Sequence, residues 1–241
     1  MKPVYERPTF ASGATFADAP QGDRSAAFCI LGAPMDWATS NRSGTREGPF
    51  AIRRASRLLI DGGHPTLGVD PMALNVSDVG DVDVLIGDIA ESHRRIEEAA
   101  TGLNHLCTLG GDHSVALPLL RAAAERHGPL GLVQFDAHTD TWAENFGQEL
   151  AHGTPFFHAL EEGLIDPKRS IQIGIHAPMD TGLMEAARDT GITILSAEEV
   201  HEAGPAAIAK RIVDTVGAGP AYLTFDVDAL DPAFAPGTGT P

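Results

Sequence analysis

An apolar run that ends in alternating acidic and imidazole side chains constrains this chain more than any other feature. Residues 130–135 are predicted to form a buried β-strand. At alternate positions directly after it come Asp136, His138 and Asp140. Because a strand places every second side chain on one face, these three groups can converge on one point beyond the strand. Oxygen and imidazole ligands without thiolate suit a hard or borderline divalent cation, with Mn²⁺ a strong candidate.

A second acidic pair closes another apolar run near the end of the chain. Residues 221–225 are predicted to form a strand, and Asp226 and Asp228 follow it at alternate positions. One aspartate at a strand end is more often a cap or turn residue than a ligand. Five ligand-type residues at two strand ends are harder to explain in that way, because packed carboxylates without a cation repel one another. The two clusters together predict a shared site for more than one ion.

A glycine-rich turn supplies a third candidate ligand. Two glycines follow a predicted strand at 106–109 and let the chain turn tightly into the next helix, which places His113 at the carboxyl end of that strand. Taken alone, the turn is also compatible with an incidental histidine or a phosphate loop. The patterns G-x-G-x-x-G and G-K-[ST] are absent, so a nucleotide site is weakly supported.

Short apolar runs alternate with amphipathic segments along most of the chain. After an irregular arm over residues 1–25, the predicted strands are 26–32, 75–79, 106–109, 130–135, 170–175, 192–195 and 221–225. The predicted helices are 49–59, 86–103, 113–127, 155–163, 181–190 and 205–216. This alternation is typical of an α/β fold with a parallel sheet covered by helices on both faces. No break in composition divides the chain, so we expect one domain over residues 1–241.

Composition and charge narrow the classes of partner. The net charge of −16 disfavours nucleic acid and anionic membranes and favours cationic ligands. No apolar run approaches the roughly 18 residues that span a bilayer, and the N-terminus lacks the apolar segment of a signal peptide. We therefore expect a cytoplasmic protein. Cys29 and Cys107 lie in apolar runs and are expected to be buried, reduced thiols rather than a disulfide.

Three motifs, in this order, resemble those of the ureohydrolase (arginase) family, which comprises arginase, agmatinase, guanidinobutyrase and formimidoylglutamase. They lie at residues 109–114, 135–140 and 224–232, the last running on to Pro241. Residues 41–44 and 141–157 look like the agmatinase and guanidinobutyrase branch, and the loop with which arginases bind the amino-acid head group is not evident. The resemblance implies a three-layer arginase-like fold with a central parallel sheet.

The same resemblance implies a binuclear manganese site, with Ni²⁺ as an alternative metal. One ion would be held by His113, Asp136, Asp140 and Asp226, and the other by Asp136, His138, Asp226 and Asp228. A hydroxide between the ions would attack the guanidinium carbon, and Asp140 would pass its proton to the leaving amine. His152 matches the family's active-site histidine, a proton shuttle or substrate-positioning group. Without the resemblance, His152 is more simply explained as a histidine at a helix entry.

The resemblance implies hydrolysis of a linear guanidino compound, such as agmatine or guanidinobutyrate, to urea and an amine in polyamine metabolism. The alternatives are a non-catalytic guanidine- or polyamine-binding protein and a formimidoylglutamase. Family members continue past the loop at 237–241 to a glutamate that pairs with the substrate guanidinium. The chain thus lacks the C-terminal part of the family fold, and we expect the native protein to be longer. A homotrimer or homohexamer is also implied.

Overall fold

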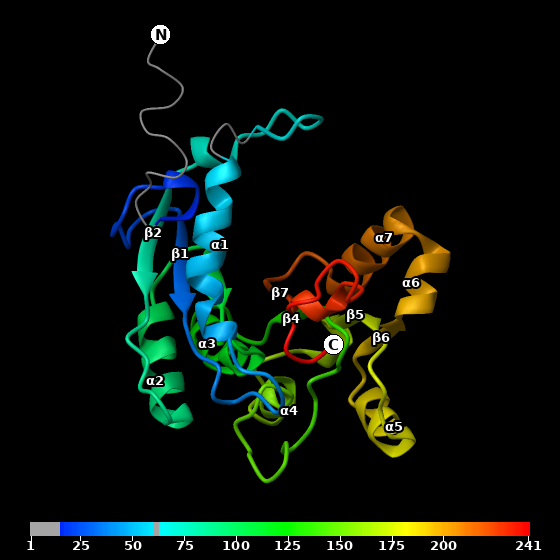
Figure 1. Cartoon of the computed structure of the whole chain (residues 1–241). Helices are drawn as coiled ribbons and strands as arrows, with labels where there is room; N and C mark the ends of the chain where they lie inside the picture. Colours follow the sequence, from blue (N-terminus) through cyan, green and yellow to red (C-terminus); the bar gives the residue numbers. More distant parts are fainter. Residues whose placement is uncertain (1–14, 60–62) are drawn as a thin grey trace. The chain divides into compact units, whose positions relative to one another are not determined.

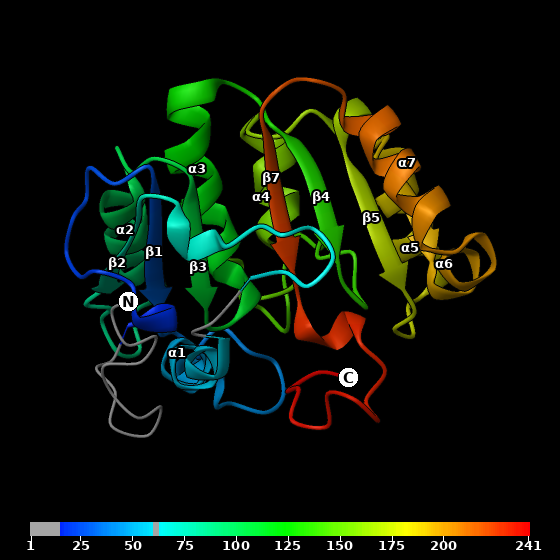
Figure 2. The same cartoon turned by 90° about the horizontal axis from the view of Figure 1, so that it is seen from above.

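The computed structural model describes residues 15–59 and 63–241 as strands that alternate with helices (Figures 1 and 2). The strands are β1 (Phe28–Ala33), β2 (Val76–Asp81), β3 (Leu106–Gly110), β4 (Gly131–Phe135), β5 (Ile171–Ile175), β6 (Thr193–Ser196) and β7 (Ala221–Phe225). The helices are α1 (Gly48–Ser56), α2 (Ile89–Ala100), α3 (Ala116–His127), α4 (Pro155–Glu161), α5 (Thr181–Asp189), α6 (Ala197–Ala203) and α7 (Pro205–Val216). Neighbouring strands in both sheets run parallel, so the predicted α/β class is confirmed.

The strands fall into two sheets, one in each of two compact units. The first unit takes in residues up to 36 together with 44–111, and its sheet has the order β2-β1-β3. The second unit takes in residues 37–43 and 112–241, and its sheet has the order β6-β5-β4-β7. The single domain expected over residues 1–241 remains a prediction.

The second unit has helices on both faces of its sheet. Leu132 and Val133 are neighbours on β4, so their side chains point to opposite faces. Leu132 packs in a cluster with residues of α3 and α4, which include Leu120 and Phe156. Val133 packs in a separate cluster that includes Ile208 of α7. This unit therefore has the three layers that the sequence pattern predicts.

We expect Phe156→Ala to lower the free energy of unfolding by about 3–5 kcal/mol, because it opens a cavity in the first of these clusters. Phe156 is 0% exposed. The matched control is Phe146→Ala, since Phe146 is 91% exposed and the same atoms are deleted. That control should change the free energy of unfolding by no more than about 0.5 kcal/mol. Urea denaturation measures both, and equal losses in the two variants would contradict the packing described here.

Helix α6 was not predicted from the sequence. Its start is a capping box: the Glu199 N–H donates to Ser196 Oγ at 3.2 Å, and the Ser196 N–H donates to Glu199 Oε2 at 2.8 Å. Ser-x-x-Glu is the sequence signature of this cap, so the signal was present. The helix has only seven residues and follows β6 without a loop, which leaves too short a segment for an apolar period to stand out.

The cysteine prediction is half right. Both thiols are free, and Cys29 is buried, but Cys107 is exposed. Cys107 lies on β3, which is an edge strand of the first unit's sheet, so its side chain is not covered as it would be in a central strand. Part of the predicted irregular arm lies outside the described residues, and a 3₁₀ turn spans Phe16–Asp18. Among the described residues, no helix is both long and apolar enough to span a bilayer.

Candidate metal centre

Two neighbouring strands of the second unit place the acidic clusters at the same edge of its sheet. β4 and β7 pair in parallel with Phe135 opposite Phe225, and Asp136 and Asp226 are the next residue on each strand. The Asp226 N–H donates to the Phe135 carbonyl at 2.9 Å, which extends the ladder to this point. Both clusters therefore lie at the carboxyl end of the sheet, where parallel α/β proteins carry their sites.

His113 reaches the same point from the start of α3. It begins a 3₁₀ turn, His113–Val115, whose cap is Asp112: the Asp112 carboxylate accepts the Ser114 N–H at 3.0 Å. The Asp112 side chain also accepts the Ala38 N–H at 3.2 Å. The glycine turn and this cap fix the direction in which the imidazole leaves the main chain.

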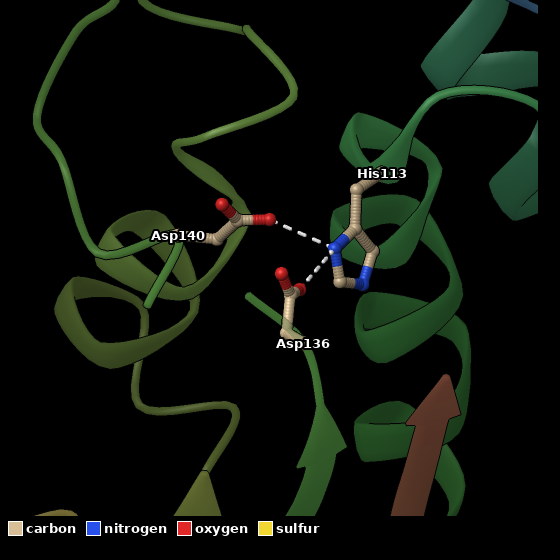
Figure 3. A group of neighbouring side chains, drawn as sticks. All are labelled: His113, Asp136 and Asp140. Atoms are coloured by element: carbon tan, nitrogen blue, oxygen red, sulfur yellow. Dashed lines mark ion pairs between the residues drawn. The ribbon is translucent and has the colours of Figure 1, made fainter. Parts of the chain in front are cut away.

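The first group of ligand atoms surrounds His113 (Figure 3). Its Nδ1 lies 2.8 Å from Oδ2 of Asp140 and 3.1 Å from Oδ2 of Asp136. Oδ2 of Asp226 is more distant, at 3.6 Å. His113, Asp136 and Asp140 each offer one ligand atom within 4.8 Å of the others, so they can hold one ion together.

The second group shares a residue with the first. His138 Nδ1 lies 3.2 Å from Oδ2 of Asp228 and 3.5 Å from Oδ1 of Asp136. Asp136, His138 and Asp228 again lie within 4.8 Å of one another. Asp136 therefore turns one oxygen to each group, as a bridging ligand does. Asp226, the other predicted bridge, belongs to neither group at this distance.

The donor set around His113 requires a cation. Its Nε2 lies 2.9 Å from Thr224 Oγ1, and its buried Nδ1 makes no hydrogen bond among the described residues although carboxylates surround it. A nitrogen lone pair aimed at carboxylate oxygens is repelled by them. Either a proton on Nδ1 or a metal ion beside it removes that repulsion. The residues present therefore fit a divalent metal ion.

The protonation of the metal-free site follows from the same crowding. Burial disfavours the imidazolium of His113, but the carboxylates of Asp136 and Asp140 outweigh it and raise the His113 pKa well above its ordinary value. For His138, burial is likewise outweighed by Asp136 and Asp228, and the pKa rises to about 10. Burial, and then the charge of Asp136, raises the pKa of Asp140. Without metal, the cluster therefore holds protons that an ion would displace.

Asp140 has an unusual main-chain conformation. Its φ is 51°, in the left-handed region that few residues other than glycine adopt, although aspartate tolerates it. The Phe156 N–H at the start of α4 donates to the Asp140 carbonyl at 3.1 Å and helps to hold this conformation. Such outliers cluster at functional sites, because the surrounding structure must stabilise them.

His152 is held by a segment far away in sequence. The Ser40 N–H donates to His152 Nε2 at 3.2 Å, and Ser40 Oγ lies 2.7 Å from the same atom. A main-chain N–H can only donate, so Nε2 is an acceptor and the neutral ring carries its proton on Nδ1. Burial, and then the charges of His138 and His113, lower the His152 pKa to about 4. His152 is therefore neutral around pH 7.

Sequence reasoning missed the polar residues that support the predicted ligands. Gln134 donates to Asp136, Gln172 donates to Gln134, Thr224 faces His113, and Ser40 holds His152. For the two glutamines a signal was present, since each is a polar residue inside an apolar strand pattern and must find a partner there. The contact with Ser40 had no such signal, because it depends on how a loop folds back.

The comparisons with known proteins agree with this geometry. The arginase family profile matches residues 26–241, and the chain belongs to that family. Within it, an agmatinase from Cronobacter sakazakii is 46% identical over 225 residues, which cover 91% of this chain and 71% of that protein.

Two solved structures extend the comparison. Proclavaminate amidino hydrolase from Streptomyces clavuligerus is 39% identical, with a TM-score of 0.91 over 98% of this chain and 80% of that one. A hypothetical agmatinase from Burkholderia thailandensis is 42% identical, with a TM-score of 0.87 over 100% of this chain and 78% of that one. The predicted arginase-like fold and the family assignment are thus confirmed.

Proposed function

We propose that this protein hydrolyses a C–N bond of a linear guanidino compound, with agmatine as the substrate, to give urea and a diamine. The observation that carries the proposal is the pair of overlapping ligand groups that share Asp136. Similarity to an agmatinase and to an amidino hydrolase supports the class of substrate. The net charge of −16 favours a cationic tail over a carboxylate tail.

Two Mn²⁺ ions fit this arrangement, because carboxylate oxygen and imidazole nitrogen are suitable ligands for manganese. In the proposal, His113, Asp136, Asp140 and Asp226 hold one ion, and Asp136, His138, Asp226 and Asp228 hold the other. When bound, the ions supply Lewis acidity that lowers the pKa of water and makes it a nucleophile near neutral pH. Asp226 completes both sets only after a small movement, since it belongs to neither group of mutually close ligand atoms.

The hydrolysis also requires a proton to move from the attacking water to the nitrogen that leaves. In the proposal Asp140 moves this proton, because its carboxylate lies against His113 within the ligand cluster and its main chain is held in place. His152 is neutral and carries its proton on Nδ1, so that atom donates toward the substrate or the leaving amine. These two residues are the proposed catalytic groups.

The test is product release from a substrate panel with the Mn²⁺-loaded protein. We expect urea from agmatine with the highest kcat/KM, and lower values for 4-guanidinobutyrate and arginine. N-formimidoylglutamate should release no formamide. Formamide as the main product would move the protein to the formimidoylglutamase branch. If no compound is hydrolysed while two ions are bound, the protein is a binding protein rather than an enzyme.

The proposal also covers the location, the metabolic role and the oligomeric state of the enzyme. We place it in the cytoplasm, in polyamine metabolism, as a homotrimer or homohexamer. The product of agmatine hydrolysis is a diamine, which supports the metabolic assignment. Light scattering during size-exclusion chromatography measures the oligomeric state, and a monomer would contradict that part of the proposal.

A further inference from the structure

Two glutamines lie side by side in the interior of the second unit, and the mechanism above uses neither. Gln134 on β4 and Gln172 on β5 are partners in the parallel ladder, and both residues are 0% exposed. A buried amide costs free energy unless it is hydrogen-bonded, so its partners show what it stabilises.

Their hydrogen bonds form a chain that ends on the shared metal ligand. Gln134 Nε2 donates to Oδ2 of Asp136 at 2.7 Å and to the His138 carbonyl at 3.1 Å. Gln172 Nε2 donates to Oε1 of Gln134 at 2.7 Å and to the Thr139 carbonyl at 2.6 Å. Both amides thus hold the segment that carries Asp136, His138 and Asp140.

The direction of both amides is determined by their surroundings. Each NH₂ group faces two acceptors, and turning either amide over would point its carbonyl oxygen at those acceptors. Gln172 keeps its orientation even though its own buried Oε1 has no hydrogen-bond partner among the described residues. An unsatisfied buried acceptor is costly, which indicates that the two donated bonds outweigh it.

The carboxylate of Asp136 is consequently held at both oxygens. Oδ2 accepts from Gln134, and Oδ1 accepts the His138 N–H at 2.8 Å. The two donors prevent the carboxylate from rotating about its last bond. Oδ2 then faces the group around His113, and Oδ1 faces the group around His138.

We propose that Gln134 is a positioning residue for the metal centre, which holds the Asp136 carboxylate so that one oxygen serves each ion, and that Gln172 in turn holds Gln134. The inference rests on the two-ion site of the proposed function. It follows the general rule that groups hydrogen-bonded to metal ligands orient them and tune metal affinity.

The first experiment measures Mn²⁺ affinity directly. Metal-depleted wild type, Gln134→Met and Gln148→Met are titrated with Mn²⁺, and free Mn²⁺ is followed by electron paramagnetic resonance. Methionine keeps the length of glutamine and removes the donor. Gln148 is exposed, so its substitution is the matched control and should leave the dissociation constant unchanged. We expect Gln134→Met to raise the dissociation constant about 10–100-fold, with two ions still bound at saturation.

The second experiment tests the chain of hydrogen bonds. Gln172→Met should raise the dissociation constant by about tenfold or less, because Gln172 contacts Asp136 only through Gln134. Most of that effect should vanish when Gln134→Met is already present, because the two residues act as a unit. If Gln134→Met does not fold, Gln172→Met alone tests whether this chain of hydrogen bonds supports Mn²⁺ affinity. The proposal would be overturned if Gln134→Met bound Mn²⁺ with wild-type affinity. It would also be overturned if the increase in the dissociation constant of the double variant equalled the product of the two single increases.

The outcome is separable from the proposed activity. If wild type releases no urea but Gln134→Met binds Mn²⁺ more weakly, the activity is wrong and the positioning role stands. If wild type hydrolyses agmatine and Gln134→Met has wild-type affinity, the activity stands and the positioning role is wrong.

Discussion

Asp136→Ala should abolish binding of both metal ions and reduce kcat/KM by at least about 10³-fold, a larger loss than we expect from a ligand that belongs to only one group. Asp136 is the one residue that belongs to both ligand groups, so its removal takes a donor from each. The ions supply several kcal/mol of transition-state stabilisation, and about 1.4 kcal/mol corresponds to a tenfold change in rate. We therefore expect a greater effect than from Asp228→Ala, which depletes only the second group.

The measurement is the manganese content per chain after dialysis, together with urea release. The matched control is Asp83→Ala, which removes the same charge from a fully exposed side chain. Metal-free circular dichroism and melting curves establish that the Asp136 variant is folded. Two tightly bound ions in folded Asp136→Ala would contradict the assignment of Asp136 as the bridge.

Much of this site could be predicted from the sequence because its ligands directly follow strands. The prediction of a strand over 221–225 matches β7, and the strand predicted over 130–135 differs from β4 by one residue. Once two such strands are parallel neighbours, Asp136 and Asp226 must lie close together. That step requires only the geometry of a parallel sheet and no knowledge of loops.

The rest depended on contacts that a pattern does not specify. The pairing of Gln134 with Gln172 depends on the register between β4 and β5. A pattern of apolar residues does not determine this register, because a shift by two residues leaves every side chain on the same face. The contact between Ser40 and His152 joins two loop positions that are 112 residues apart. The pattern of apolar residues also did not predict the helix ends. Helix α2 begins at Ile89, three residues later than predicted, because Asp88 caps it.

The second large effect concerns pH: overall Mn²⁺ binding should strengthen by at least about 100-fold for each unit of rising pH near neutrality. In the metal-free protein, the neighbouring carboxylates outweigh burial and raise the His138 pKa to about 10 and the His113 pKa well above its ordinary value. Both imidazoles then hold a proton at pH 7. A metal ligand must be deprotonated, so binding two ions releases about two protons from the imidazoles. Asp140, whose pKa burial and the charge of Asp136 raise to about 7, adds part of a third.

The sign follows from linkage, because the metal-free state holds more protons than the metal-bound state and rising pH favours the latter. The effect spans the range below the His138 pKa of about 10 and fades above it. Asp136 contributes no proton: burial opposes its ionisation, but the neighbouring imidazoles of His113 and His138 outweigh burial and lower its pKa.

Calorimetric titration with Mn²⁺ in two buffers of different ionisation enthalpy, at one pH, counts the protons released. The matched variant is His138→Asn, which keeps a polar side chain of similar shape but carries no proton to displace. Its count should fall by about one proton, and the gain in its affinity per pH unit should be about tenfold smaller than in wild type. An affinity independent of pH in wild type would mean that the imidazoles are already neutral. The carboxylates around His113 Nδ1, at 2.8 and 3.1 Å, would then need some cation other than a proton even without manganese.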